Sequence, residues 1–352
     1  MSTQRKNLLE AVLNGAWGTI GPKSIASAEL IAKRLNVNHG LLLHSASAAL
    51  EAQLRALEIG YGDEVIVASY GDPIDSMTVA AVGATPVFAD IDPDFVVLSP
   101  ESVKKAMTSK TKAVITDIPG GNPCDAKKLA DLCGESGAKL IINLGDGYDS
   151  LYDGLFLTHY AWGTVLNLSD GCAVSAGAGG AVVNNDKDAY CACFAYHNCG
   201  RAPGDGSTLV MDDILGGNMR ITEWQAAMVE AGISELDDVL AKRKNNAKKI
   251  SQALSSCGWL TPVPVIDKGV SSPGALIFRY GKDKNNNLPV DTAVGELRGQ
   301  GYDARRPWKA MHRQPAFASP YFQKITGRTG KYGDAGLDNS IAAEEELIWI
   351  LL

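Results

Sequence analysis

The segment KAVITDIPGGNPCDAKKLADLCGESGAKLIINL (112–144) places two short apolar runs on either side of an amphipathic one. The runs KAVITDI (112–118) and KLIINL (139–144) are nearly continuous in apolar residues, which is typical of strands buried on both faces of a sheet. The residues between them, 125–137, have the apolar spacing of a helix. A strand, a connecting helix and a second strand in this order predict two parallel strands joined by a crossover helix.

The same alternation continues on both sides of this segment. Strand patterns follow at 64–69, 85–90 and 179–185, and helical patterns at 24–35, 45–60, 76–82 and 101–109. Turn residues at Gly71 and Pro73 separate the first of these strands from its helix. We therefore expect an α/β fold in which a mostly parallel sheet carries helices on both of its faces.

A long helical pattern at 222–258 leads into a second region of the chain. That region has its own strand pattern at 274–280 and a helical pattern at 290–301. Because one large α/β unit and a smaller one suit a chain of 352 residues, we predict a large domain at 1–240 and a small C-terminal domain at 241–352.

Composition limits the kind of partner that the protein can have. The formal net charge is -7 and the sequence pI is about 5.3, so a main role in binding nucleic acid is not expected. No apolar run approaches the roughly 20 residues of a membrane helix, and the first residues lack the apolar segment of a secretory signal. Seven scattered cysteines give little support for a zinc site or a disulfide framework. We expect a cytoplasmic protein that does not bind membranes.

Seven motifs together carry a family resemblance. They are HSASAAL (44–50), GYGDEVIVASYGD (60–72), GATPVFADIDPD (83–94), SAGAGGAVVNND (175–186), YHNCGR (196–201), GGNMRITEWQAA (216–227) and GYDARRPWKAMHRQP (301–315). In this order and spacing they resemble the DegT/DnrJ/StrS family of sugar-nucleotide aminotransferases. The resemblance implies fold type I, with a mixed, mostly parallel seven-stranded sheet in the large domain, a small C-terminal α+β domain, and a dimer with active sites at the subunit interface. It also implies transfer of an amino group from glutamate to a keto sugar, with pyridoxal phosphate (PLP) held by a Schiff base to lysine.

Four positions depart from the family pattern. The family lysine position holds Cys172, and no lysine occurs between Lys139 and Lys187. Asn143 stands where the family has the aspartate that keeps the pyridine nitrogen protonated, and the stacking and phosphate-serine positions hold Asp72 and Asn167. A Schiff base needs a primary amine, so we expect that ordinary transamination is lost. A one-turn slip that gives the aspartate role to Asp146 is the alternative.

The resemblance also marks residues that are retained. Ser45, Ala46 and Ser47 match the turn that cradles the cofactor phosphate at a helix N-terminus, and Asn218 matches a residue that reaches the neighbouring subunit's phosphate site. Residues that the resemblance places near a nucleotide sugar are Arg220, Arg305, Trp308, Lys309, His312 and Gln314. Arginine and lysine suit a diphosphate, and tryptophan offers a flat face for a sugar or base.

Three hypotheses follow for the function. In the first, the chain binds a nucleotide sugar without covalent cofactor, as a homodimer or as a non-catalytic subunit beside an active homologue. In the second, Cys172, Asp146 and Asp72 converge in the old cofactor pocket of a repurposed, PLP-free sugar-modifying enzyme. In the third, an enzyme such as a sugar dehydratase binds PLP or its amine form (PMP) non-covalently. No metal is expected.

Overall fold

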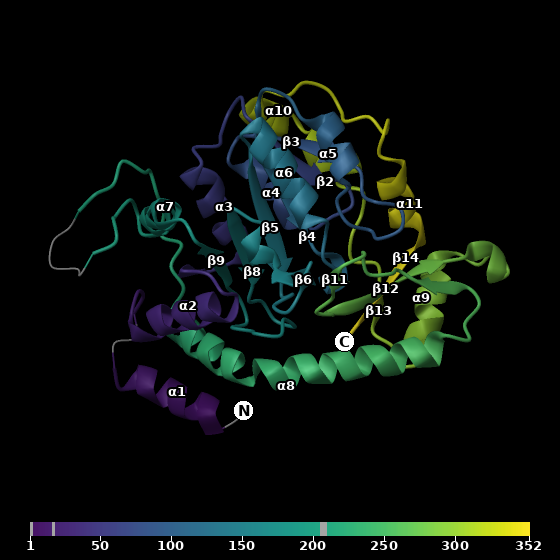
Figure 1. Cartoon of the computed structure of the whole chain (residues 1–352), viewed down its shortest axis with the longest axis horizontal. Coiled ribbons are helices and arrows are strands. Elements are labelled where there is room, and N and C mark those ends of the chain that lie inside the picture. Colours follow the sequence, from purple (N-terminus) through teal and green to yellow (C-terminus); the bar gives the residue numbers. More distant parts are fainter. Residues whose placement is uncertain (1–2, 16–17, 205–209) are drawn as a thin grey trace.

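The computed structural model describes residues 3–15, 18–204 and 210–352. Its centre is a seven-stranded sheet in the order β1-β9-β8-β5-β4-β2-β3 (Figure 1). The strands are β1 (His39–Leu43), β2 (Glu64–Ala68), β3 (Thr85–Ala89), β4 (Thr111–Asp117), β5 (Lys139–Gly145), β8 (Gly163–Asn167) and β9 (Gly180–Asn184). The five strands from β8 to β3 are parallel to one another, whereas β9 is antiparallel to both of its neighbours. The predicted mostly parallel sheet is therefore confirmed.

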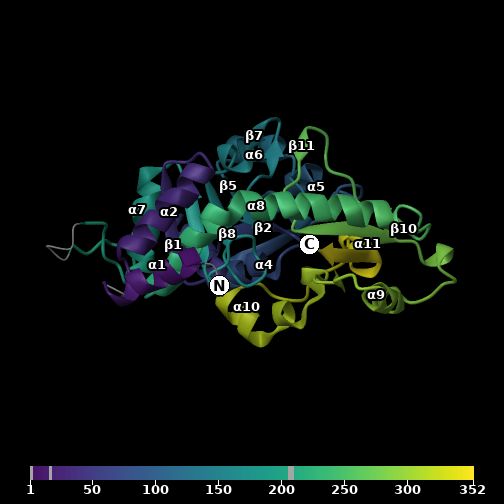
Figure 2. The same cartoon turned by 90° about the horizontal axis from the view of Figure 1, so that it is seen from below.

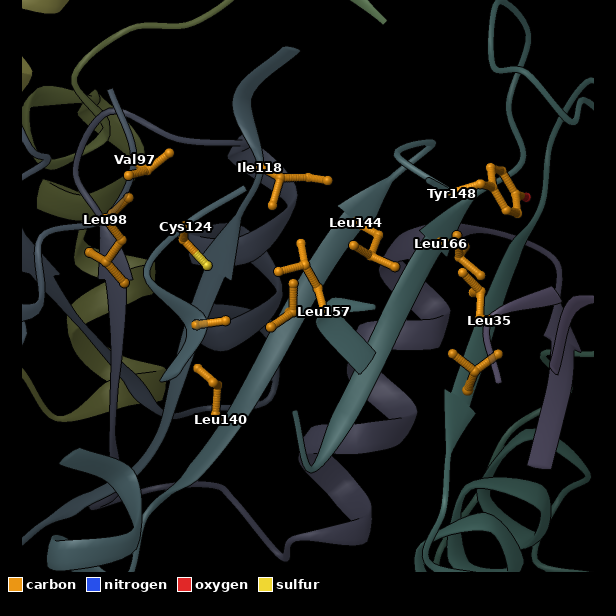
Figure 3. Packing of buried hydrophobic residues seen from close by; sticks show 14 of the residues in the cluster. Leu35, Val97, Leu98, Ile118, Cys124, Leu140, Leu144, Tyr148, Leu157 and Leu166 are labelled. Atoms are coloured by element: carbon orange, nitrogen blue, oxygen red, sulfur yellow. The ribbon is translucent and has the colours of Figure 1, made fainter. Parts of the chain in front are cut away.

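Helices cover both faces of this sheet, and alternate residues of each strand pack on opposite sides. On one face, Ile66, Val114 and Ile142 join a core cluster that reaches α2 and α6. On the other, Val65, Ile115 and Ile141 join a cluster with α3 and α4. Figure 3 shows part of the first cluster. The helices are α2 (Pro22–Arg34), α3 (Ala46–Ala56), α4 (Pro73–Ala81), α5 (Pro100–Ala106), α6 (Ala126–Ser136) and α7 (Lys187–His197).

Helix α4 begins earlier than its apolar pattern predicts. The sequence suggested a start at Ser76 after a turn at Pro73, but the helix begins at Pro73, and Asp72 is its N-cap. The Asp72 carboxylate accepts a hydrogen bond of 3.0 Å from the backbone N–H of Ile74. Proline is well suited to the first helical position because its fixed φ matches the helix and its missing N–H has no partner there in any case. The expected turn was therefore wrong at this residue.

The long helix α8 (Glu223–Leu254) runs beneath the sheet and leads to the second region (Figures 1 and 2). It begins with a capping box between Thr222 and Gln225, and α1 (Thr3–Leu13) packs against it. The second region contains a four-stranded sheet of β10 (Leu260–Pro262), β12 (Ala275–Tyr280), β14 (Leu347–Leu351) and β13 (Ala304–Arg305), with α9 (Val290–Gly299) beside it. A small third sheet consists of β6 (Leu151–Tyr152), β7 (Leu155–Phe156) and β11 (Gly269–Val270).

The chain returns to the large sheet before its last strand. Met311, Phe317 and Phe322 belong to the same core cluster as Val79 and Phe88 of the large sheet region. This segment includes α10 (Pro320–Thr326) and is followed by α11 (Asp338–Glu346), which leads into β14. The domain boundary at 240/241 stays a prediction. In the described ranges, no helix combines the length and apolar character needed to cross a membrane.

Candidate functional site

A cavity of about 500 Å³ lies at the carboxyl ends of β4 and β5. The loop after β8, the middle of α8 and the second sheet complete its walls. Parallel strands end at one edge of their sheet, which is where α/β proteins commonly bind ligands. Six of the residues singled out from the sequence line it: Asp72, Asn143, Asp146, Cys172, Arg305 and Trp308. No lysine is among the described residues of its lining.

Cys172 lies in the loop after β8 and is half-buried. Burial, and to a smaller extent the nearby carboxylate of Asp146, raises the pKa of its thiol to about 12. The guanidinium of Arg243 opposes this shift without cancelling it. Because the thiolate is the reactive form of cysteine, the surroundings of Cys172 do not activate it as a nucleophile.

This environment predicts a slow reaction of Cys172 with electrophiles. At pH 8 we expect iodoacetamide to modify it on the order of a hundredfold or more slowly than an ordinary exposed thiol, since so little thiolate is present. Peptide mapping by mass spectrometry measures this rate in the native protein, with Cys191, also half-buried, as the comparison. Modification of Cys172 as fast as a free thiol would show that the loop activates it.

Asp146 is held by a buried ion pair. Its Oδ2 lies 2.6 Å from Nη1 of Arg243 and accepts a hydrogen bond of 3.0 Å from the backbone N–H of Ala173. Nη2 of Arg243 donates to the carbonyl oxygen of Gly171 at 2.9 Å. The guanidinium thus ties α8 to the loop that carries Cys172. Arg243 was not predicted from the sequence; the available signal was an arginine on the buried face of a long helix.

A cluster of three aspartates, which we call the carboxylate cluster, surrounds Asn143. Its members are Asp72, Asp75 and Asp117. The amide Nδ2 of Asn143 donates to Asp75 at 2.9 Å and makes a longer contact of 3.4 Å with Asp72. The backbone N–H of Asp72 donates to Oδ2 of Asp117 at 2.6 Å. Asn143 is therefore a bridge between acidic side chains.

Burial dominates the electrostatics of the carboxylate cluster. Burial raises the pKa of Asp117 to about 7, and it also raises the pKa of Asp72. Burial, followed by repulsion from Asp117 and Asp72, raises the pKa of Asp75 well above its usual value. Such shifts are expected where like charges share a desolvated site. Asp75 and Asp117 were missed from the sequence, although an aspartate at the end of the apolar run 112–118 was a visible signal.

The expected phosphate cradle lies outside the lining of this cavity. Ser45 caps α3, because its Oγ accepts a hydrogen bond of 3.1 Å from the backbone N–H of Ala48, and it also contacts the Oγ of Ser47. Ala46 is buried and Ser47 is exposed. Asn167 uses its Oδ1 to accept hydrogen bonds from the backbone and side chain of Ser169. None of these four residues is among the described residues that line the cavity, and their assignment to a cofactor site stays a prediction.

Comparison with known proteins gives the family. Residues 1–329 match the DegT/DnrJ/EryC1/StrS aminotransferase family. The chain belongs to that family. A 3-amino-5-hydroxybenzoate synthase of Amycolatopsis mediterranei is 28% identical over 320 residues, which cover 89% of this chain and 81% of the relative. A GDP-perosamine synthase of Vibrio cholerae is 29% identical over 246 residues, covering 70% and 66%. The crystal structure of a 3-amino-5-hydroxybenzoic acid synthase superposes with a TM-score of 0.89 at 25% identity and covers 100% of this chain and 91% of that one.

Fold type I and its seven-stranded sheet are therefore established for this member of the aminotransferase family. The family depends on PLP. In the cavity of this chain, Cys172 and Asp146 lie beside Arg243, and Asn143 lies between Asp72 and Asp75. Among the described residues, no group of three or more His, Cys, Asp or Glu side chains is arranged to hold a metal ion.

Two of the family motifs lie away from the cavity. Asn218 pairs with Asn198 in a short backbone bridge, and Arg220 donates to the side chains of Asn198 and Thr19, both at 2.9 Å. Arg220 lines a smaller hollow of about 100 Å³ between α2, β1 and α7. Their assignment to a phosphate site and a sugar site stays a prediction.

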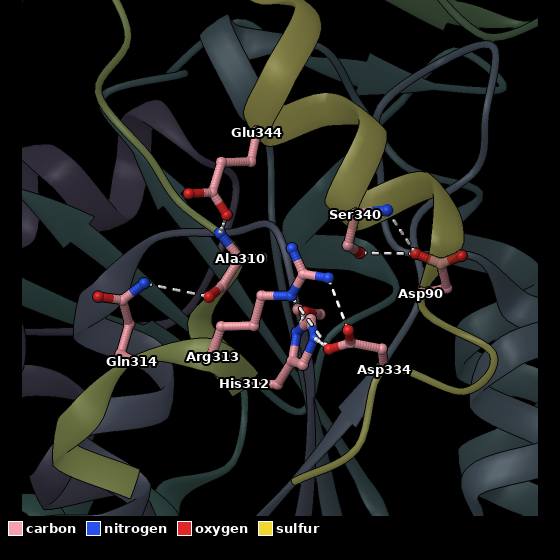
Figure 4. Close-up of polar contacts among 9 residues, drawn as sticks. Asp90, Ala310, His312, Arg313, Gln314, Asp334, Ser340 and Glu344 are labelled. Atoms are coloured by element: carbon pink, nitrogen blue, oxygen red, sulfur yellow. Dashed lines mark hydrogen bonds and ion pairs between the residues drawn. The ribbon is translucent and has the colours of Figure 1, made fainter.

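The motif at 301–315 is divided between the cavity wall and a structural network. Arg305 and Trp308 line the cavity, and Lys309 is exposed. His312 is only 3% exposed, and its ring nitrogens contact Ser69 and Asp334. Gln314 donates to the carbonyl oxygen of Ala310 at 3.2 Å (Figure 4). His312 thus ties the returning segment to Ser69, which directly follows β2, whereas the bond of Gln314 lies within that segment. Neither residue is among the described residues that line the cavity, and their assignment to a sugar site stays a prediction.

Proposed function

We propose that this chain binds a nucleotide-linked sugar in the cavity and does not transaminate it through an internal Schiff base. One observation carries the proposal: the residue at the family's lysine position is Cys172, and no lysine is among the described residues that line the cavity around it. A thiol cannot form the imine that the family chemistry requires.

The remaining contacts of the cofactor also do not fit the residues present. Asn143 is neutral, and its amide is engaged by Asp75, so it cannot stabilise a pyridinium as a carboxylate does. Asp72 caps α4 at the position where a flat side chain would stack on the ring. Arg243 holds Asp146, the alternative partner for the ring nitrogen. The residues present therefore do not fit a covalently held PLP.

The side chains at the rim of the cavity support a sugar nucleotide as ligand. Arg305 is exposed and, among the described residues, forms an ion pair of 2.7 Å with Asp303. Lys309 of the same motif is exposed but is not among the described lining residues. Trp308 packs edge-on against Trp349, which fixes the orientation of its indole. A cation and an oriented ring suit a diphosphate and a sugar or base. The name of the Vibrio cholerae relative specifies a GDP-linked sugar.

The same proposal includes an assembly and a location. Either two copies of this chain, or this chain and an active homologue, would form the dimer. All seven cysteines are free, which supports a reducing compartment such as the cytoplasm. Size-exclusion chromatography with light scattering tests the dimer.

Spectroscopy and mass analysis test the loss of the Schiff base. The purified protein, incubated with PLP, freed of unbound PLP by gel filtration and then reduced with borohydride, is expected to keep its unmodified mass and to show no aldimine absorption band. The Vibrio cholerae GDP-perosamine synthase is the positive control. A stable PLP adduct on any lysine of this chain overturns the proposal, and a cofactor band without an adduct supports non-covalent PLP or PMP instead.

Thermal shifts test the ligand. We expect at least one UDP-, GDP- or dTDP-linked sugar to raise the melting temperature, and Arg305→Ala and Trp308→Ala to weaken this effect. Arg313→Ala is the matched control, because Arg313 pairs with Asp334 outside the cavity lining. If no nucleotide or nucleotide sugar shifts the melting temperature, the binding proposal fails.

One observation favours a second candidate, a PLP-free sugar-modifying enzyme. Cys172, Asp146 and Asp72 line the same cavity, as this reading requires. The raised pKa of the Cys172 thiol and the ion pair at Asp146 weigh against these two residues, whereas Asp72 has a raised pKa suited to proton transfer. Turnover of a nucleotide sugar that Asp72→Asn abolishes supports this candidate.

A further inference from the structure

Some of the acidic side chains that line the cavity form ion pairs and others do not. Five aspartates and two arginines are among the residues that line it. Arg243 pairs with Asp146, and Arg305 pairs with Asp303. The other three lining aspartates are Asp72, Asp117 and Asp170, and no ion pair to them occurs within the described ranges. Asp170 is exposed, whereas Asp72 and Asp117 lie at the inner end beside Asn143.

Asp117 has an acceptor that no described residue satisfies. The residue is only 4% exposed, and its Oδ1 is buried without a hydrogen-bond partner among the described residues. Its other oxygen accepts the backbone N–H of Asp72. An unsatisfied buried carboxylate oxygen is costly, so a donor supplied by a ligand at this point is favourable. In the Asp72 carboxylate beside it, Oδ1 accepts the backbone N–H of Ile74 at 3.0 Å, whereas Oδ2 has a long contact of 3.4 Å with Asn143.

We infer that the inner end of the cavity binds a primary ammonium group, so that the sugar held there is an amino sugar. This inference rests on the proposed function and names the class of its ligand. A primary ammonium carries three donors and a positive charge, which match two neighbouring carboxylates. A hydroxyl supplies one donor and no charge. A metal ion is disfavoured, because the described residues form no ligand set for one.

The rim and the inner end of the cavity then bind groups of opposite charge on the same ligand. The exposed Arg305 takes the anionic nucleotide end, and the carboxylate cluster takes the cationic end of the sugar. An anion at the inner end would meet Asp72 and Asp117 directly and be repelled. The same reasoning excludes a phosphate as the occupant of that end.

Calorimetric titration with matched sugars tests the inference. The probes are UDP-glucosamine, UDP-glucose and UDP-N-acetylglucosamine, with free glucosamine and glucose as a pair that carries no nucleotide. We expect UDP-glucosamine and glucosamine to bind at least about tenfold more tightly than the probes that lack a free amine. The reason is that an ammonium group forms a charge-assisted hydrogen bond where a hydroxyl or an amide forms a neutral one. Asp117→Asn is expected to abolish this preference, and Asp170→Asn, which removes an exposed charge at the same cavity, to keep it.

The outcomes separate this inference from the proposed function. Equal affinities for UDP-glucosamine and UDP-glucose overturn the inference and leave nucleotide-sugar binding intact. An Asp117-dependent preference for free glucosamine without binding of any nucleotide-linked probe supports the ammonium site and overturns the proposed ligand. A preference that survives Asp117→Asn, or the absence of binding by every amine, overturns the inference. Should Asp117→Asn fail to fold, the comparison of amine with hydroxyl on the unmodified chain decides.

Discussion

Replacing Arg243 with methionine is expected to lower the free energy of unfolding by about 3 kcal/mol, because the change leaves the Asp146 carboxylate without its partner. The two side chains are only 10% and 22% exposed, and their closest atoms are 2.6 Å apart. The substitution also removes the donor to the carbonyl oxygen of Gly171. Chemical denaturation followed by circular dichroism measures the change, and methionine keeps most of the buried volume of the arginine stem.

A double-mutant cycle separates the ion pair from general damage to α8. Arg243→Met combined with Asp146→Asn should recover a large part of the loss, since no unpaired charge then remains. Lys244→Met is the matched control. Lys244 is the next residue of the helix and forms a more exposed pair with Asp149 at 3.6 Å, so its loss is expected to cost less than about 1 kcal/mol. Equal effects of the two single substitutions would refute the role given to Arg243.

The ion pair also bears on the chemistry of the loop. A lysine introduced by Cys172→Lys would meet Arg243 and the residues that hold Asp146, so this change alone does not rebuild the family's cofactor site. Three of the four altered positions, Asp72, Asn143 and Cys172, line this cavity, where Arg243 of α8 compensates Asp146 and Asn143 bridges the carboxylate cluster.

The sheet was predictable because its strands are buried on both faces. Continuous apolar runs such as 112–118 and 139–144 leave few alternatives, and both became strands at nearly the expected bounds. β1 and β8 were not predicted, because HGLLL and GTVLN are short and carry no repeated pattern of their own. Pairing with β9 orders both of them, and pairing depends on contacts distant in the sequence.

The site was predictable only where a residue departs from the family pattern. Cys172, Asn143 and Asp72 were found that way, and all three line the cavity. Asp75 and Arg243 lie on helices, where a charged residue is ordinarily on the exposed side, so their burial depends on tertiary packing. His312 matched its motif by spacing, yet spacing does not report that both of its ring nitrogens are already engaged.

Lowering the pH from about 7 to about 4 is expected to raise the free energy of unfolding of this protein. The pKa of Asp117 is raised from 3.8 to about 7 in the folded chain. Between these values the folded state holds a proton that the unfolded state has lost, so the free energy of unfolding falls as the pH rises from about 4 to about 7. Asp72 and Asp75, whose pKa values are raised by the same burial, act in the same direction.

Asp117→Asn is therefore expected to stabilise the folded protein at pH 8, on the order of 2 kcal/mol, because the neutral amide removes a buried charge that would otherwise have to ionise. At pH 4 the variant and the parent should differ much less, since Asp117 is protonated in the folded parent at that pH. Urea denaturation at a series of pH values measures both quantities, and the exposed Asp170→Asn should follow the parent curve throughout. If stability is flat from pH 4 to 7, or if Asp117→Asn destabilises the protein equally at pH 4 and pH 8, Asp117 does not sit as a charge-bearing acceptor at the inner end of the cavity. The ammonium site then loses its physical basis as well, because it depends on the same unsatisfied oxygen.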